Sequence, residues 1–517
     1  MPERSATVPS WVVDAVLVGT VVLIGALIRW PNLWLVPTFT DETAEAVLAM
    51  RIFRDEVAPL TNVEPYIGAL WNYLLAAGFW AFGLNPWLPR LFAFVAGALT
   101  VGATYWLGRE LGGRLGGPVA GTFMATCSTH ALVNSHVGWS HATTPLWATL
   151  GLACLARALC GRASSGRWLV LAGLSLGLAV QTHVTAVLLL PGAALAVLLC
   201  RPTLLRTRWT AFAAVAFVLA ISNLVAFNVQ TAGGSFSAGQ QVLADYSGDE
   251  GGTDVSDYLG NLGRLTLALS WVLSGAIEKR RFVNESLADP RLVLYLGTAV
   301  AAVAWAAWRR YPLPLLVTVP YLLALPFLTA KYEPMLNGRY LVPVLPLVFA
   351  SIGLATGNIW CAAQRRLGGS SSMVVAVVLT LGIGGLAAYP LVPMSRYVQA
   401  ARTNHAILAA HEVILADRQP GEVVLLDYGL DGVFFMAAGS AFKSMELLLT
   451  GSGIPYVVID ARAASVGDAL AGETSRLLVL NADKASPLGR AFALTPLMPG
   501  GGRNGPGFDV YRVAAAR

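Results

Sequence analysis

The sequence predicts a polytopic α-helical membrane protein that ends in a small α/β domain. Of its 517 residues, 56% are hydrophobic and only 12% are charged, and the mean hydropathy is +0.62. Because a soluble domain carries about 25% charged residues, most of this chain is expected to be surrounded by lipid. From about Arg396 the long apolar runs give way to short strand-like segments, which predicts a separate small domain there.

The charged residues and the cysteines exclude two other classes of protein. The net charge of +6 does not indicate nucleic-acid binding, because the arginines occur in short clusters between apolar runs. That distribution is the one expected of cytoplasmic loops under the positive-inside rule. The five cysteines all lie in or at the ends of hydrophobic runs, which predicts neither a disulfide framework nor a cysteine-based metal site.

The first hydrophobic run, Trp11–Trp30, is expected to be a signal anchor. It has about 20 residues, enough to span a bilayer, and no convincing cleavage site follows it. With Arg4 on the cytoplasmic side, this helix delivers the loop 31–65 to the outside. The adjacent carboxylates Asp41 and Glu42 therefore lie at the outer membrane surface.

Two apolar runs are expected to lie along the outer leaflet rather than to cross the membrane. The basic loop Arg109–Arg114 belongs in the cytoplasm, and it would be outside if 66–84, 88–108 and 117–132 all crossed. We therefore predict that 66–84 does not cross. The run 263–278 is treated in the same way, because its crossing would place Arg309 and Arg310 outside. The result is about eleven membrane helices, with the C-terminal end outside the cytoplasm.

The predicted domains are a membrane domain over 1–395 and an α/β domain over 396–517. Short buried strands are expected at Glu422–Asp427, Pro455–Asp460, Arg476–Asn481 and Phe508–Val513, bounded by Gly, Pro and Asp. Helical stretches at 403–416 and 442–450 alternate with them, as in an α/β fold.

This topology places four groups of polar side chains on the outer side. They are Asp41 with Glu42, the loop 134–141 with His136 and His141, the tight turn at His183, and the basic residues Arg280, Arg281, Lys331 and Arg339, the last followed by Tyr340.

Each group also has a purely structural interpretation. The carboxylates suit a solvated loop, the histidines suit hydrogen-bonded packing, and the cations can snorkel into lipid headgroups. A divalent metal held by His136 and His141, with Asp41 or Glu64 as a further ligand, stays open, and no other cofactor is implied. A positive cluster opposite a carboxylate also suits a lipid-phosphate substrate, because arginine can grip two phosphate oxygens.

Five motifs follow one another in a recognisable order between about Asp14 and Pro393. They are Asp41–Glu45, Glu64–Trp71, Gly83–Leu91, Gly108–Gly113 and Gly338–Pro343. Together they resemble the bacterial GT-C membrane glycosyltransferases related to protein O-mannosyltransferases and to the aminoarabinose transferase of lipid A. The resemblance implies two interfacial helices in the first outer loop and another after the seventh span, which agrees with the runs that the charges keep from crossing.

The resemblance also implies roles for individual residues. Asp41, with Glu42 beside it, would receive or orient the proton of the acceptor, and Arg339 would hold the lipid-linked phosphate. Glu64, near Tyr66, resembles a glutamate close to the cavity, although Pro65 stands where the lipid A enzymes have a lysine. The segment His136–Thr144 stands where those enzymes carry a second aspartate, which argues against the same acceptor.

The resulting hypothesis is an inverting glycosyltransferase of the bacterial inner membrane. Its partners would be a polyprenyl-phosphate-linked sugar, membrane lipids and a glycan, lipid or protein acceptor, with no nucleic acid. Such a donor suits a chain without a nucleotide-binding motif. Arg339 would act with Lys331, Arg280 or Arg281, and the cavity would include Glu64, Tyr66, His136, His141 and His183.

Two alternatives remain. A lipid-glycan flippase would place charges within its spans, where only Asp14 stands clearly inside an apolar run. A non-catalytic assembly factor would work through the C-terminal domain. The sequence names neither the sugar nor the acceptor.

Overall fold

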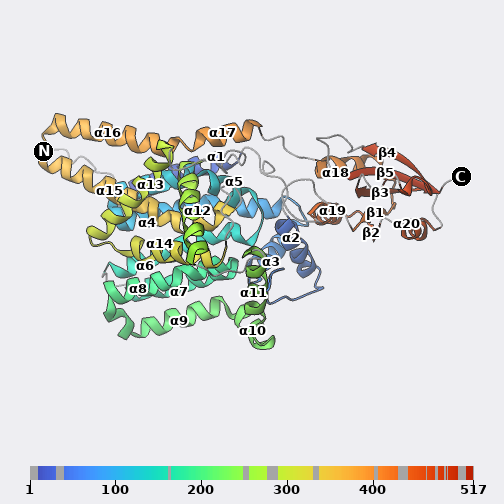
Figure 1. Cartoon of the computed structure of the whole chain (residues 1–517), viewed down its shortest axis with the longest axis horizontal. Helices are drawn as coiled ribbons and strands as arrows, with labels where there is room; N and C mark the ends of the chain where they lie inside the picture. Colours follow the sequence, from blue (N-terminus) through green and yellow to red (C-terminus); the bar gives the residue numbers. More distant parts are fainter. Residues whose placement is uncertain are drawn as a thin grey trace, which may run out of the picture.

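A helical bundle and a smaller α/β region lie end to end along the long axis of the molecule (Figure 1). The computed structural model describes residues 10–30, 40–160, 165–247, 255–275, 289–329, 337–400, 406–428, 440–460, 463–471, 475–481, 485, 487–498 and 508–515. The predicted site residues Arg280, Arg281 and Lys331 lie outside the described residues.

The bundle is built from α-helices and short 3₁₀-helical turns, the latter labelled η. Its elements are α1 (Ser10–Arg29), α2 (Thr40–Phe53), α3 (Leu70–Phe82), α4 (Leu88–Thr126), α5 (Ser128–His136), η1 (Ser140–Thr143), α6 (Thr144–Leu159), α7 (Ser165–Thr182), η2 (Val184–Leu188), α8 (Leu189–Cys200), η3 (Pro202–Arg206), α9 (Arg208–Ala220), α10 (Ser222–Gln230), α11 (Gly234–Ser247), α12 (Val255–Ser274), α13 (Pro290–Trp308), α14 (Leu313–Ala324), η4 (Leu325–Phe327), η5 (Asn337–Val344), α15 (Leu345–Arg366), α16 (Gly369–Ala388) and α17 (Leu391–Ala400).

Among the described residues, five helices are long and apolar enough to cross a membrane. The number is six if α9 and α10, bent by 64° at their junction, form one broken span. The apolar stretches Val184–Cys200 and Leu313–Phe327 are shorter. The predicted number of about eleven crossings is therefore not confirmed, whereas the predominantly helical membrane architecture is.

Helix α4 consists of two helices that fold back on each other at Gly113. Gly113 has φ 68° and ψ −153°, a conformation outside the helical region that glycine adopts readily. A Cβ atom on Gly108 would collide with the carbonyl oxygen of Gly116, and one on Gly117 would meet the ring of Tyr105. These contacts pair residues on either side of the bend, so the two halves form a hairpin. The predicted runs 88–108 and 117–132, separated by a polar turn, agree with it.

Ion pairs join three helices near this bend. Asp14 of α1 accepts a hydrogen bond from Nη2 of Arg109 at 3.0 Å, and Arg157 of α6 pairs with Glu110. Asp14, the only carboxylate in the first apolar run, thus has a partner at the helix hairpin. This contact gives Asp14 a role in packing.

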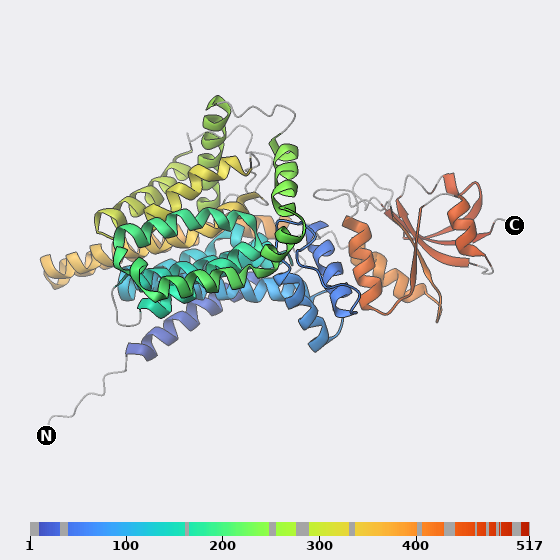
Figure 2. The ribbon, with the colours of Figure 1, turned by 90° about the horizontal axis from the view of Figure 1, so that it is seen from below.

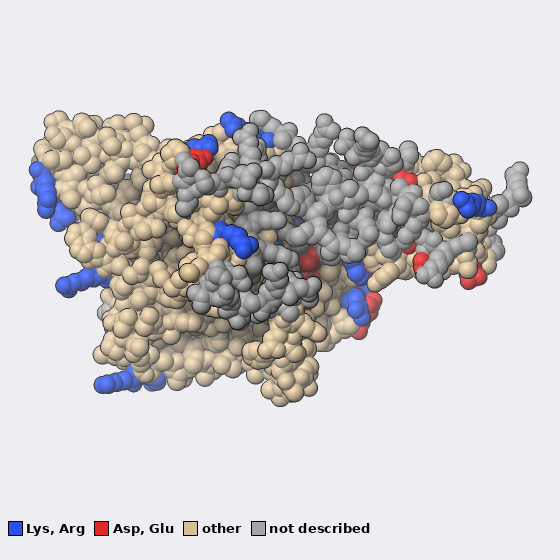
Figure 3. All heavy atoms as spheres, viewed as in Figure 1, with Lys and Arg blue, Asp and Glu red and all other residues tan. Residues whose placement is uncertain are grey.

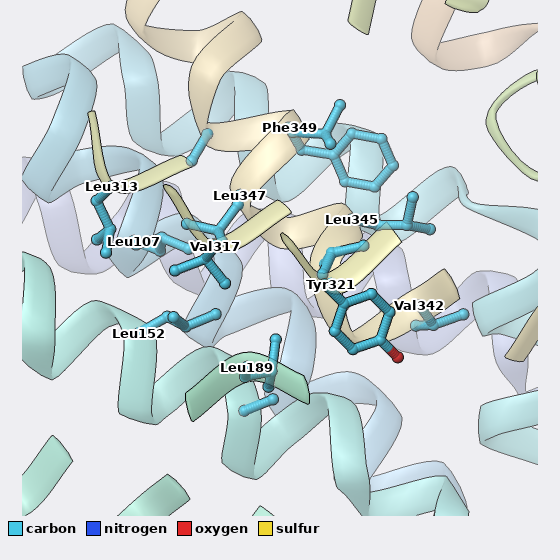
Figure 4. Packing of buried hydrophobic residues seen from close by; sticks show 14 of the residues in the cluster. Leu107, Leu152, Leu189, Leu313, Val317, Tyr321, Val342, Leu345, Leu347 and Phe349 are labelled. Atoms are coloured by element: carbon cyan, nitrogen blue, oxygen red, sulfur yellow. The ribbon is translucent and has the colours of Figure 1, made fainter. Parts of the chain in front are cut away.

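The core of the bundle lies around α15, which packs along α4. Buried side chains from α4, α6, α8, α14, η5 and α15 meet there, among them Leu107, Leu152, Leu189, Val317 and Leu345 (Figure 4). The peripheral helices α1 and α16 contrast with this core, because only 11% of the residues in their apolar windows are buried. Apolar residues exposed over whole helices suit contact with lipid.

Three helices near the predicted outer surface have the properties of interfacial elements. Helix α3 has 13 residues and is about 20 Å long, short of the roughly 30 Å of a bilayer core. Helix α12 runs across the direction of α7 and α9 (Figure 1) and is not among the candidate spans in the described chain. The expectation that 66–84 and 263–278 do not cross the membrane stays a prediction. Helix α2 begins with two acidic residues, which favour a helix N-terminus through the helix dipole.

The C-terminal region is a five-stranded mixed sheet with helices on both faces. Its elements are α18 (Ala406–Asp417), β1 (Val424–Asp427), α19 (Ser440–Gly451), β2 (Tyr456–Ile459), α20 (Ala463–Leu470), β3 (Ser475–Asn481), β4 (Phe492–Met498) and β5 (Phe508–Ala515). The strand order is β2-β1-β3-β5-β4, with β1 parallel to β2 and β3, and β5 antiparallel to β3 and β4. Helices α18 and α19 cover one face and α20 the other.

Strand β4 is the one strand of this sheet that the sequence did not predict. Its Pro496 removes a backbone donor, which argues against a central strand. The strand is an edge strand that pairs only with β5, and its register shifts between Pro496 and Met498. An edge position with an irregular register tolerates proline.

Helices α2 and α3 lie between the bundle and the C-terminal region in both views (Figures 1 and 2). Helix α19 packs directly against α2. The helix that carries Asp41 therefore contacts both parts of the molecule.

Candidate active site

A cavity of about 460 Å³ lies where α2, the loop 59–68, η1, the start of η2, α11 and η5 meet. Seven side chains predicted from the sequence line it, namely Asp41, Glu64, Tyr66, His141, His183, Arg339 and Tyr340. Asp41 and Arg339, which are nearly 300 residues apart in the sequence, thus face the same space. Its lining also includes Glu45, Trp139 and Ser140, which the sequence analysis did not select.

Glu42, proposed as a catalytic residue beside Asp41, is not among the residues that line this cavity. Its carboxylate accepts hydrogen bonds from Nε of Arg90 at 2.6 Å, from Nη2 of Arg90 at 2.8 Å and from the backbone N–H of Gly138 at 2.8 Å. Both side chains of the pair are buried. A Cβ atom on Gly138 would lie 2.6 Å from Cβ of Pro89, so only glycine allows this close approach. Glu42 therefore fixes the first turn of α2, the turn that also carries Asp41.

Asp41 is open to the cavity, and its carboxylate responds to two opposing influences. Desolvation raises its pKa above the usual value, and the positive charge of Arg339 lowers it. The guanidinium of Arg339 is itself buried, with its Cζ 4.3 Å from the centroid of the Trp139 ring and its Nη2 donating to the Tyr340 hydroxyl at 2.8 Å. Burial between aromatic faces strengthens the field of this cation at Asp41.

Two further carboxylates lie close to Asp41. Glu45 follows Asp41 by four residues, which places both on one face of α2. It accepts hydrogen bonds from the N–H of Ser140 at 2.6 Å and from its hydroxyl at 2.9 Å. Burial, offset by these hydrogen bonds and assisted by the charge of Asp41, raises the pKa of Glu45 to about 8. Burial and then Asp41 also raise the pKa of Glu64, while Tyr66 lowers it.

A tight loop presents Glu64 and Tyr66 to the cavity. Thr61 and Gly68 form an isolated antiparallel bridge at its base, and the N–H of Gly68 donates to the carbonyl oxygen of Gln181 at 2.8 Å. Pro65 accepts a hydrogen bond on its carbonyl oxygen from the hydroxyl of Ser235 of α11. This position therefore contributes a backbone contact and no charge.

The histidines fall into two groups. His141 and His183 line the cavity and stack with ring centroids 4.0 Å apart. His136 is outside it, because Nδ1 of this buried ring donates to the carbonyl oxygen of Ala131 at 2.6 Å within its own helix. His136, predicted to lie in the cavity, is therefore not among the side chains that line it.

This arrangement separates His136 from His141, the two histidines that the metal alternative would use as a pair of ligands. His136 and His141 are only five residues apart, yet one packs inside α5 and the other faces the cavity. Over the described part of the chain, no three His, Cys, Asp or Glu side chains are arranged to hold a metal ion.

Two of three comparisons with known proteins find a match to this chain. The family model for dolichyl-phosphate-mannose-protein mannosyltransferase matches residues 68–226. No curated protein matches the chain.

Solved structures that resemble the chain include GT-C fold glycosyltransferases. The crystal structure of ArnT from Cupriavidus metallidurans bound to undecaprenyl phosphate superposes with a TM-score of 0.59 at 15% identity, over 98% of each chain. The archaeal oligosaccharyltransferase AglB from Archaeoglobus fulgidus, in complex with an inhibitory peptide and a dolichol-phosphate, gives a TM-score of 0.53 at 13% identity, over 92% of this chain and 70% of that one. The chain thus has the GT-C fold of these membrane enzymes.

Proposed function

We propose that the protein is a membrane glycosyltransferase that moves a sugar from a polyprenyl-phosphate donor to an acceptor hydroxyl. The observation that carries the proposal is the cavity shared by Asp41 and Arg339, an acid and a cation that donor and acceptor could contact together. The fold supports the class of donor, because the similar structures of ArnT and AglB hold undecaprenyl phosphate and a dolichol-phosphate.

The proposed reaction is a single displacement at the anomeric carbon. The acceptor oxygen attacks this carbon while its proton passes to the Asp41 carboxylate, and the bond from the carbon to the phosphate oxygen breaks with its electron pair on the phosphate. A base with a raised pKa holds this proton better at neutral pH than an ordinary aspartate does. Arg339 stabilises the negative charge that develops on the leaving phosphate.

The remaining parts of the hypothesis concern orientation and domains. Lys and Arg side chains gather at the end of the bundle farthest from the C-terminal region, and the visible flank between the two ends carries few charges (Figure 3). This distribution follows the positive-inside rule if the basic end is cytoplasmic. It supports the proposal that the cavity and the domain 396–517 lie outside the cytoplasm, at a bacterial inner membrane. Arg280, Arg281 and Lys331 are proposed as additional phosphate contacts. The domain 396–517 is proposed to act on the acceptor, because α19 rests on α2.

The decisive experiment measures sugar transfer by purified protein in lipid vesicles. Wild-type protein and the Asp41→Asn variant are supplied with radiolabelled undecaprenyl-phosphate sugars and membrane extract as the source of acceptor. General-base catalysis contributes about 10²–10⁴-fold, so the variant is expected to lose most of its turnover while it still binds undecaprenyl phosphate. Full activity of Asp41→Asn would reject Asp41 as the base.

The same vesicles separate the two alternatives. A flippase would move the labelled lipid across the bilayer when no acceptor is present, and the proposed transferase would not. An assembly factor would show neither activity.

A further inference from the structure

We propose that the stacked imidazoles of His141 and His183 form the subsite that binds the sugar of the donor, and that this subsite selects an uncharged sugar with free hydroxyl groups. The proposal rests on the proposed function, since it divides the same cavity into a phosphate part at Arg339 and a sugar part beside it. The rings of Trp139 and Tyr340 connect the two parts. Their centroids lie 6.0 Å and 5.8 Å from that of His141.

The proton position on His183 follows from a backbone contact. The N–H of Thr185 donates to Nδ1 of His183 at 3.2 Å, so this nitrogen is the acceptor and carries no proton. Burial, and then the charge of Arg339, lowers the pKa of His183 to about 3, which keeps the ring neutral. The single proton therefore resides on Nε2, and His183 offers the cavity a hydrogen-bond donor.

His141 offers both a donor and an acceptor. The side chain is only 2% exposed, and neither ring nitrogen has a hydrogen-bond partner among the described residues. Burial, followed by the neighbouring His183 and Arg339, holds the pKa of His141 well below its ordinary value. A neutral imidazole has one N–H and one bare nitrogen, and leaving either unpaired when water is displaced costs free energy.

The ligand that satisfies this pair must both donate and accept. A phosphodiester only accepts, so it would leave the bare nitrogen of His141 unpaired. An ammonium group only donates, so it would leave the N–H unpaired, and it would also lie close to the positive charge of Arg339. A hydroxyl group does both, and a sugar carries several of them at the spacing of a ring. The hydrogen-bonding groups of His141 and His183 thus favour a neutral hydroxylated sugar over an amino sugar.

The test compares lipids that differ only in the sugar. Binding of undecaprenyl phosphate, undecaprenyl-phosphate mannose, undecaprenyl-phosphate glucose and undecaprenyl-phosphate 4-amino-arabinose is measured for the wild type and His141→Phe. Phenylalanine keeps the ring stack and removes both nitrogens. The matched control is His411→Phe, the same change at a half-buried histidine of α18 that bonds Ser452 far from the cavity.

The expected result for the wild type is tighter binding of at least one hexose lipid than of undecaprenyl phosphate, with no gain for the amino sugar. His141→Phe should weaken the hexose lipid about tenfold and leave undecaprenyl phosphate unchanged, which corresponds to the loss of a buried hydrogen-bonding group. His141→Gln, which again has a donor and an acceptor, should recover part of the difference, and His411→Phe should change nothing.

Three outcomes would overturn the inference. Equal weakening of all four lipids by His141→Phe would make the stack part of the phosphate site, and no weakening at all would make it packing. A wild type that binds undecaprenyl phosphate but gains nothing from either hexose would also reject the sugar subsite. Failure of the proposed function looks different, because the wild type would then bind none of the four lipids.

Discussion

Replacing either member of the buried pair between Glu42 and Arg90 should destabilise the protein more than replacing both. Both side chains are almost fully inaccessible, and the carboxylate accepts hydrogen bonds from Arg90 and from the N–H of Gly138. Glu42→Met or Arg90→Met leaves one buried charge without its partner, which costs about 3–5 kcal/mol. The double variant removes both charges, so the remaining cost is that of unpaired neutral groups such as the N–H of Gly138, about 1–3 kcal/mol for each.

Unfolding of the three variants is measured in parallel in detergent micelles, with the loss of tryptophan fluorescence as the signal. The matched control is Arg51→Met on the same helix, because Arg51 pairs with Glu56 at 3.4 Å and both side chains are nearly half exposed. An exposed pair of this kind contributes at most about 1 kcal/mol. Turnover should fall with Glu42→Met as well, since the first turn of α2 loses its attachment to the bundle.

Substitutions at the neighbouring residues Asp41 and Glu42 are expected to have different effects. Asp41→Asn should leave stability nearly unchanged and remove turnover, whereas Glu42→Met should lower both. The reasoning would be refuted if the double variant were as unstable as the worse single variant, or if Arg51→Met cost as much as Arg90→Met.

Three more predictions concern protonation, packing and the C-terminal region. The pKa of Glu45 is about 8 in the folded state, above the ordinary value of a glutamate, so the folded state binds more protons than the unfolded state between these two values. The free energy of unfolding should therefore fall as pH rises through this window. Glu45→Gln should flatten that fall in an unfolding series from pH 5 to 8. A steeper fall in the variant would contradict this sign. Gly116→Val places side-chain atoms against the backbone of Gly108 in the hairpin of α4, so it should lower the melting temperature, whereas Gly297→Val in α13, where nothing lies within 4 Å of the added atom, should not. Equal effects of the two valines would disprove the close packing. Removal of 396–517 should reduce transfer to the acceptor more than it reduces binding of undecaprenyl phosphate, and equal loss of both would argue that this region only supports folding.

The parts of the fold that hydropathy and charge control could be predicted from the sequence. The basic turn Arg109–Arg114 separates two apolar runs, and the structure places a hairpin there. Asp41 and Arg339 follow and precede long apolar segments, so the same reasoning that oriented those segments brought both residues to one cavity. Hydropathy and charge are properties of neighbouring residues in the sequence, and the lipid environment constrains every segment that enters the membrane.

The parts that depend on distant pairs could not be predicted. Glu42 reaches Arg90 and Gly138 across 48 and 96 positions, and no periodic pattern links these residues in the sequence. Without that partner, Glu42 resembled a second catalytic acid. His136 was misplaced for a similar reason, because its distance from the cavity depends on a bond to Ala131 within α5. Glu45 carried a usable signal, since it follows Asp41 by one helical turn.

Helix α2, which carries Asp41, is not among the helices of the described chain that are suited to cross the bilayer. It contacts two parts of the molecule, because Glu42 pairs with Arg90 of the bundle and α19 packs against α2. A thinner or thicker bilayer acts on the crossing helices through hydrophobic mismatch, so it should tilt the bundle without separating Asp41 from its support. A binder such as an antibody fragment that attaches to α19 acts instead on the element that packs against the helix of Asp41, the proposed base. A binder at α19 is therefore expected to change turnover more than a change of bilayer thickness does.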